Sequence, residues 1–347
     1  MIPDQTATDA PKEPRVAILG DGQMALVAAD LLVHNAASCV MWSHDAGALA
    51  ELDRTRRSPR LQDFTLDQSV ETEPDLARAV SDAELILSAI PTPFLRDVWS
   101  PLKGRLDVEI PFVSVTKGVE IRTLLTPTQI VADALGESPE TRPSAVLSGP
   151  TIAAELARRL PATMIAASAH HDLALRVQRL FGSPWMRVYT SDDPLGVEIA
   201  GAVKNVIAIA AGAIDGLDLG VNAKSALLAR GLAEIARLGA RLGATPETFF
   251  GVAGVGDLAT TCFSPHGRNR TCGEALGRGE SLDDYLARTS SVVEGVKTTK
   301  AVTAWSIRLG VDMPITHAVH AVLFENVPPK KAIGMLMNRP VGEERLV

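Results

Sequence analysis

Residues 15–35 read RVAILGDGQMALVAADLLVHN, a short apolar run followed by a glycine turn and then by apolar residues at helical spacing. Gly20, Gly22 and Ala25 form the pattern G-D-G-Q-M-A at the turn. This pattern suits a dinucleotide pyrophosphate, because Gly20 permits the tight bend and Gly22 lets a phosphate approach the backbone at the helix amino terminus. An ordinary strand–helix turn is the alternative. The place of the pattern at the first strand of an alternating series favours the phosphate turn.

The chain after this turn alternates apolar runs with helical segments. The predicted strands are SCVMW (38–42), LILSAI (85–90), FVSVT (112–116), AVLS (145–148), TMIAAS (163–168) and RVYT (187–190). Strands separated by helices indicate βαβ units and a mostly parallel sheet. We therefore expect an α/β Rossmann-type domain over residues 15–192.

The pattern changes after residue 192. From Pro194 onward the segments are rich in Ala, Leu and Gly at helical spacing, with helices expected over 194–215, 222–242, 245–251, 272–287 and 295–309. This predicts an all-α domain over residues 193–347. Because no flexible linker separates the two domains, we expect them to pack closely, with a cleft between them. Residues 1–14 have prolines and acids but no apolar core, so we expect a disordered tail and no signal peptide.

Composition excludes several classes of protein. The 347 residues carry a net charge of −7 and only 4% aromatic residues, which argues against a nucleic-acid binder and a polybasic membrane-surface protein. The most apolar stretch, residues 199–214, is interrupted by Lys204 and Asn205, so no membrane span is expected. Three cysteines without a C-x-x-C pair, and histidines without ligand spacing, predict a reducing, cytoplasmic compartment and no bound metal.

The residues after the second predicted strand bear on the choice of coenzyme. Ser43 and His44 are compatible with the 2′-phosphate of NADPH, whereas Asp45 could bind the ribose 2′-hydroxyl of NADH. Three basic residues follow shortly, namely Arg54, Arg56 and Arg57. The balance favours NADPH over NADH, although these arginines could also form a solvated helix face.

Two lysines stand in unusual surroundings. Lys117 follows the strand FVSVT directly, and the carboxyl ends of strands in an open α/β sheet face the ligand crevice. Lys204 lies in GAVKNVIAIAAG, a helix with small or apolar residues on every side. Burial would lower its pKa and make it a proton donor or acceptor near neutral pH. A loop lysine and a snorkelling surface lysine are the alternatives.

Three further segments could bind an anion or orient a lysine. LSGPTIAAEL (147–156) places free backbone N–H groups between a strand and a helix, unless Thr151 only caps that helix. Asp257 lies in the glycine-rich GVGDLATTC, where it could cap a helix or orient a lysine. Arg268 and Asn269 follow in HGRNR, where the arginine could clamp a phosphate or simply be exposed.

Together these segments resemble the bacterial NAD(P)-dependent glycerol-3-phosphate dehydrogenases over nearly the whole chain from Arg15 onward. The resemblance is carried by VTKGVE, LSGPTIAAELARRLPA, GVEIAGAVKNVIAIAAG, GVAGVGDLATTC, RNR and VVEGVKTTK, which occur in the family order. It implies a Rossmann-type domain joined to an all-α domain of the 6-phosphogluconate-dehydrogenase-like kind. It also implies reduction of dihydroxyacetone phosphate, a phosphorylated three-carbon substrate, for glycerophospholipid synthesis, in a homodimer.

The resemblance assigns roles to individual residues. Lys204 is the implied general acid/base, and Lys117 contacts both substrate and cofactor. The implied substrate contacts are Lys117, Gly149, Thr151, Lys204, Asn205, Asp257, Arg268 and Asn269. The implied cofactor contacts are Gly20, Gly22, Gln23, Met24, His44, Lys117, Ala153, Arg268, Val292 and Glu294. The turn departs from the family pattern, which has an aromatic residue where Met24 stands and glycine at Ala25.

Other functions remain open at this point. A related two-domain ketone or hydroxy-acid reductase would share the layout but would not need Arg268 for a phosphate. A catalytically weak relative that only binds cofactor or metabolite would fit the altered turn but not the retained Lys117 and Lys204. A methyltransferase would not explain the lysine-bearing helical domain.

Overall fold

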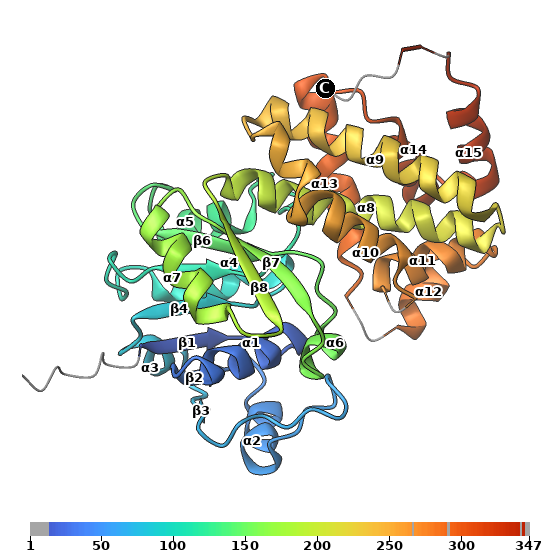
Figure 1. The fold of residues 1–347 in the computed structure, drawn as a ribbon. Helices are drawn as coiled ribbons and strands as arrows, with labels where there is room; N and C mark the ends of the chain where they lie inside the picture. Colours follow the sequence, from blue (N-terminus) through green and yellow to red (C-terminus); the bar gives the residue numbers. More distant parts are fainter. Residues whose placement is uncertain (1–13, 266, 290–291, 341, 344–347) are drawn as a thin grey trace, which may run out of the picture.

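The computed structural model describes residues 14–265, 267–289, 292–340 and 342–343; the predicted tail over 1–14 therefore lies almost wholly outside the described residues. The chain folds into a sheet-containing half and a helical half, which lie side by side in Figure 1.

Eight strands form one sheet in the order β3-β2-β1-β4-β5-β6-β7-β8. Their bounds are β1 (Arg15–Leu19), β2 (Ser38–Trp42), β3 (Glu71–Thr72), β4 (Leu85–Ser88), β5 (Phe112–Ser114), β6 (Ser144–Ser148), β7 (Ala162–Ala167) and β8 (Met186–Ser191). All neighbours pair in parallel except β6 and β7, which are antiparallel. The predicted mostly parallel sheet is confirmed. The short β3 was not predicted, because it has only two residues and no apolar run.

Two of the predicted strands are too long. The runs 85–90 and 112–116 leave the sheet after Ser88 and Ser114. Just beyond the strands, the Ala89 amide donates to the Leu19 carbonyl oxygen at 2.9 Å and the Val115 amide to that of Ser88 at 3.0 Å. The Thr116 hydroxyl also donates to the Ile90 carbonyl oxygen at 2.7 Å, which joins the ends of the two runs.

Helices cover both faces of the sheet because its strands are apolar on both sides. The helices of this half are α1 (Gln23–His34), α2 (Ala46–Thr55), α3 (Leu76–Val80), α4 (Thr92–Trp99), α5 (Pro127–Leu135), α6 (Ala153–Ala157) and α7 (His171–Phe181). One core lies under α1, α6 and α7 and includes Leu26 and Phe181. The other lies under α3, α4 and α5 and includes Trp99 and Phe112.

The helical half contains α8 (Pro194–Gly216), α9 (Gly220–Leu242), α10 (Asp257–Phe263), α11 (Arg268–Gly277), α12 (Leu282–Arg288), α13 (Glu294–Leu309), α14 (Pro314–Phe324) and α15 (Pro329–Met337). The expected helix over 245–251 is a 3₁₀ turn, Pro246–Phe250, and a π turn, Val252–Gly256, follows it. The expected helix over 272–287 is two helices. The Glu280 amide donates back to the Ala275 carbonyl oxygen, and the Ser281 hydroxyl then caps α12.

Helix α8 is the centre of the helical half and is buried along most of its length. It has the length and hydropathy of a membrane-crossing helix, but 89% of that window is buried inside the protein, as in a core helix. It packs very closely on α11: a Cβ on Gly212 would lie 1.9 Å from the Arg270 carbonyl oxygen, and one on Gly273 would lie 1.9 Å from that of Ile209. The glycines therefore fix the separation of these two helices.

Candidate active site

The phosphate turn joins β1 to α1. Gly20 has φ +117°, and a Cβ there would lie 3.0 Å from the Ala89 carbonyl oxygen, so glycine is required. Among the described residues, no side chain caps the amino terminus of α1, and the space beside Gly22 is open to 4 Å. Met24 packs partly buried against the core beneath the turn. Free N–H groups beside open space fit a dinucleotide pyrophosphate.

The residues after β2 differ in their contacts. The buried Ser43 hydroxyl accepts a hydrogen bond from the Asp45 amide at 3.2 Å, and Asp45 Oδ1 caps α2 by accepting from the Ala48 amide at 2.9 Å. His44 is exposed. The Asp45 carboxylate therefore has a structural role in the helix cap, which accounts for an acid at this position without a ribose contact.

A buried carboxylate joins the two predicted lysines. Lys117 Nζ donates to Asp257 Oδ2 at 2.6 Å, and Lys204 Nζ donates to Asp257 Oδ1. Lys204 and Asp257 are only 6% and 2% exposed. The expected burial of Lys204 is confirmed, and of the two roles considered for Asp257 the structure shows that it orients both lysines. Lys117 comes from the loop after β5, Lys204 from the middle of α8 and Asp257 from the start of α10.

The charges and the burial of this cluster bring the pKa of Lys204 close to neutral pH. Burial lowers the pKa of Lys204 to about 8, with the Asp257 charge opposing and the Lys117 charge adding to the shift. Burial alone would raise the pKa of Asp257, but Lys117 and Lys204 hold it below its ordinary value. The carboxylate therefore stays ionised between two ammonium groups.

Helices α11 and α13 close the other side of the cluster. Arg268 is exposed, whereas Asn269 is buried and its Oδ1 accepts from the Gly295 amide at 2.9 Å. Asn205 Nδ2 lies 3.4 Å from Glu294 Oε2. Burial raises the pKa of Glu294, and the charge of Arg268 opposes this shift most strongly, followed by the charges of both lysines. Arg268, Glu294 and the lysine pair therefore share one electrostatic environment.

The turn after β6 faces the same region. Thr151 does not cap α6; its hydroxyl donates to the Gly149 carbonyl oxygen at 3.2 Å, and Ile152 takes the cap position without a side-chain bond. A Cβ on Gly149 would lie 2.7 Å from the Thr163 carbonyl oxygen and 3.4 Å from Val252 Cγ1. Gly149 thus lies against the turn that leads to Asp257. Ala153 is buried at the start of α6, and Val292 is exposed before α13. Among the described residues, neither of them forms a side-chain hydrogen bond or an ion pair with the lysine cluster, and nor does His44.

Two hydroxyl groups in the cluster were missed in the sequence. Thr261 accepts from Lys204 Nζ at 2.8 Å and donates to the Asp257 carbonyl oxygen at 2.7 Å. Its spacing of four residues after Asp257 on one helix face was the signal that could have found it. Ser148 is 3% exposed, and its hydroxyl has no hydrogen-bond partner among the described residues. A Cβ on Gly201 would lie 3.6 Å from this hydroxyl and 3.4 Å from Lys117 Cγ, so Ser148 lies beside Lys117.

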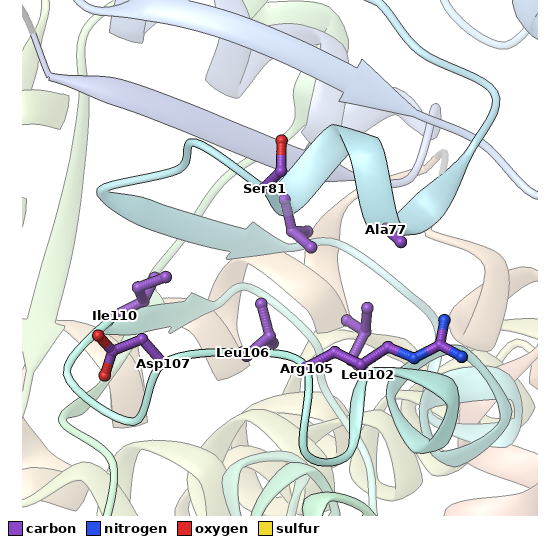
Figure 2. Close-up of a pocket in the computed structure, with 8 residues that line it drawn as sticks. Ala77, Ser81, Leu102, Arg105, Leu106, Asp107 and Ile110 are labelled. Carbon is purple, nitrogen blue, oxygen red and sulfur yellow. The ribbon is translucent and has the colours of Figure 1, made fainter.

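Other groups lie outside the cluster. The three cysteines are buried and unpaired, and within the described ranges no three His, Cys, Asp or Glu side chains gather as a metal site would require. A cavity of about 310 Å³ lies between α3 and the segment before β5, and none of the predicted site residues lines it. Figure 2 shows the side chains that line it. Its lining consists of Ala77, Val80, Ser81, Leu102, Arg105, Leu106, Asp107 and Ile110.

Comparisons with known proteins bear directly on this arrangement. Family models described as the NAD-dependent glycerol-3-phosphate dehydrogenase amino and carboxyl termini match residues 15–174 and 193–334. The NAD(P)+ glycerol-3-phosphate dehydrogenase of Prosthecochloris aestuarii is 43% identical over 326 residues, covering 93% of this chain and 98% of that protein. The Staphylococcus aureus enzyme of the same name is 40% identical over 332 residues, covering 95% and 99%.

A solved structure agrees with the sequence matches. The crystal structure of glycerol-3-phosphate dehydrogenase from Coxiella burnetii superposes with a TM-score of 0.89 at 32% identity, covering 95% of this chain and 100% of that one. Both halves of the chain are therefore accounted for by one family, and the rival two-domain reductases and the methyltransferase are not needed. The chain belongs to the NAD-dependent glycerol-3-phosphate dehydrogenase family.

Proposed function

We propose that the protein reduces dihydroxyacetone phosphate to sn-glycerol 3-phosphate with NADPH or NADH, reversibly, and so supplies glycerophospholipid synthesis. The observation that carries this proposal is the buried Lys204, bound to Asp257 beside Lys117, where the loop after β5 meets α8 and α10. A ketone reductase needs a proton donor and a fixed positive charge at the carbonyl oxygen, and this cluster contains both.

The protein's own residues would prepare the carbonyl for reduction. Lys204 gives a proton to the carbonyl oxygen as negative charge develops there, and Lys117 adds a second positive charge nearby. Asp257 and Thr261 hold the Lys204 ammonium group in one orientation. Bound NADPH or NADH supplies the hydride to the carbonyl carbon.

The remaining predicted residues bind and orient the substrate and coenzyme. Arg268 and Asn269 would hold the substrate phosphate, with Gly149, Thr151 and Asn205 lining the rest of the substrate site. Gly20, Gly22, Gln23 and Met24 form the phosphate turn, and His44, Ala153, Val292 and Glu294 are further proposed cofactor contacts. The free amino terminus of α1 supports the first group, and the charge environment shared by Arg268 and Glu294 supports the second.

We also propose a cytoplasmic homodimer. Buried, unpaired cysteines suit a reducing compartment. Exposed apolar side chains on the helical half, among them Ile307 at 71% and Met337 at 80%, offer surface for pairing. Light scattering coupled to size exclusion tests the dimer, which a monomer mass at micromolar concentration would exclude.

The function is tested by following the absorbance of the reduced nicotinamide with purified protein and dihydroxyacetone phosphate. NADPH and NADH are run side by side, with unphosphorylated dihydroxyacetone as the matched substrate. We expect oxidation that depends on the phosphorylated ketone. If a folded protein oxidises neither coenzyme, the activity is absent and a cofactor-binding role replaces it.

A further inference from the structure

The loop after α2 is tied to the phosphate turn at two points. Gln23 Nε2, at the start of α1, donates to the Arg60 carbonyl oxygen at 2.6 Å. Arg60 Nε lies 3.5 Å from Asp21 Oδ2, and Asp21 is the residue between the two glycines of the turn. Both contacts use side chains of the turn itself. Arg60 is therefore held beside the phosphate turn by both its backbone and its side chain.

Two of the three arginines that the sequence brought forward are engaged elsewhere, and Arg57 is exposed, with only its backbone bonded among the described residues, to the Thr55 hydroxyl. Arg54 forms two hydrogen bonds with Glu51 on the exposed face of α2, at 2.6 and 3.1 Å. Arg56 donates to the Val70 carbonyl oxygen at 2.7 Å and to Asp53 at 3.2 Å. By contrast, the Arg60 side chain is 47% exposed, and within the described part of the chain only Asp21 contacts its guanidinium group.

The adenosine ribose of a dinucleotide lies between the phosphate turn and the end of the second strand, and an arginine near that position accommodates a 2′-phosphate. We propose that Arg60 binds the 2′-phosphate of NADPH and sets the preference of this protein for NADPH over NADH. This proposal rests on the proposed coenzyme-dependent function. The planar guanidinium group can give a phosphate two parallel N–H donors, which a lysine cannot.

The contacts around Arg60 explain why its charge remains available. An ion pair with a partly exposed guanidinium group is weak, so Arg60 can exchange Asp21 for a phosphate dianion. The turn tether through Gln23 uses the Arg60 backbone and leaves the side chain free to move. Asp45, the acid that would favour NADH, already accepts the hydrogen bond that caps α2.

The test compares adenosine 2′,5′-bisphosphate with adenosine 5′-monophosphate by calorimetry, using the intact protein. Since hydrogen bonds between charged groups are the strong ones, we expect the wild type to bind the bisphosphate roughly 10- to 100-fold more tightly. Arg60→Ala should remove most of that difference while binding of the monophosphate stays unchanged. Arg54→Ala is the matched control and should change neither. Arg60→Lys should keep part of the difference.

Three results would overturn the proposal. The first is equal affinity of the wild type for the two nucleotides, and the second is a preference for the bisphosphate that survives in Arg60→Ala. The third is an equal loss of affinity for both nucleotides in that variant. The last would mean that Arg60 only neutralises Asp21. This binding measurement does not depend on turnover. If the protein is inactive on dihydroxyacetone phosphate but still prefers the bisphosphate through Arg60, the proposed function is refuted and the role of Arg60 is supported.

Discussion

At the scale of single residues, the account depends on the charge state of Lys204. A lysine 6% exposed in a helix of apolar residues would lose its proton readily, and the carboxylate of Asp257 offsets that tendency. The result is a pKa of about 8, close enough to neutrality for the group to give or take a proton. Lys117 would make the site still more positive, and Asp257 balances part of that charge as well.

The first prediction concerns the pH dependence of reduction. Because Lys204 must be protonated to act as the acid, kcat for reduction should fall as pH rises through about 8, while kcat for oxidation should rise. Asp257→Asn removes the charge that raises the pKa of Lys204, so the falling limb should move to lower pH. Steady-state profiles with saturating substrate measure both effects. A limb that stays in place or moves to higher pH in the variant would refute this assignment.

The second prediction concerns the substrate phosphate. Arg268→Ala should raise KM for dihydroxyacetone phosphate by roughly 10- to 100-fold, the range for a lost charged hydrogen bond, with a smaller change in kcat. Arg278→Ala, which removes an arginine 67% exposed at the end of the same helix, is the matched control. An unchanged KM in Arg268→Ala would remove its phosphate-binding role.

At the scale of elements, the active site depends on how closely α8 and α11 approach. Lys204 is on α8, and Arg268 and Asn269 are on α11. The two backbones meet at Gly212 and Gly273 without room for a Cβ. Any added side chain must push the helices apart, and with them the proposed proton donor and the proposed phosphate-binding residues.

The third prediction follows from this contact. Gly212→Ala should lower the free energy of unfolding by about 1–3 kcal/mol, the usual cost of overpacking, and should also lower kcat/KM. Gly334→Ala is the control, because Gly334 lies in α15 with open space around it, and a gain of about 0.4–1 kcal/mol is expected there. Urea unfolding and steady-state kinetics check both. Wild-type stability in Gly212→Ala would show that the helix contact is not tight.

The sequence predicted the elements that carry strong local signals. The phosphate turn, the strand before Lys117 and the buried helix around Lys204 were found because glycine spacing and apolar runs are local properties. The joining of Lys117, Lys204 and Thr261 through Asp257 is a contact between distant segments, which no local pattern encodes. The antiparallel β6–β7 pair and the Arg60–Asp21 contact were missed for the same reason.

At the scale of the whole molecule, two buried glutamates hold helices together across the fold. Glu198 on α8 accepts from the Thr128 amide and hydroxyl, both at 2.8 Å, at the first turn of α5 in the sheet half. Glu234 on α9 accepts from the Ile315 and Thr316 amides at the first turn of α14. Glu198 therefore links the helix that carries Lys204 to the sheet half.

The fourth prediction is the pH dependence of stability. Burial raises the pKa of both glutamates to about 7 from an ordinary 4.5. The folded protein therefore binds these protons more tightly than the unfolded chain, and their contribution is full below about pH 4.5 and is lost as pH rises to about 7. The loss in the free energy of unfolding is up to about 3 kcal/mol for each glutamate.

Urea unfolding across this pH range measures the effect. Glu234→Gln cannot titrate, so its stability should vary less between these pH values than that of the wild type, whereas the exposed Glu247→Gln should follow the wild type. If the free energy of unfolding changes by the same amount over this pH range in the wild type and in both variants, the role of Glu234 is contradicted.

The proposed role of Lys204 as the proton donor of a dihydroxyacetone phosphate reductase is decided by kcat of Lys204→Ala, measured together with the affinity of this variant for NADPH. Loss of the general acid should lower kcat by about 10²- to 10⁴-fold, while NADPH still binds as in the wild type. Lys297→Ala, an exposed lysine on α13, is the control and should keep full activity. Turnover near the wild-type rate in Lys204→Ala, in a variant that folds and binds NADPH, would contradict the account.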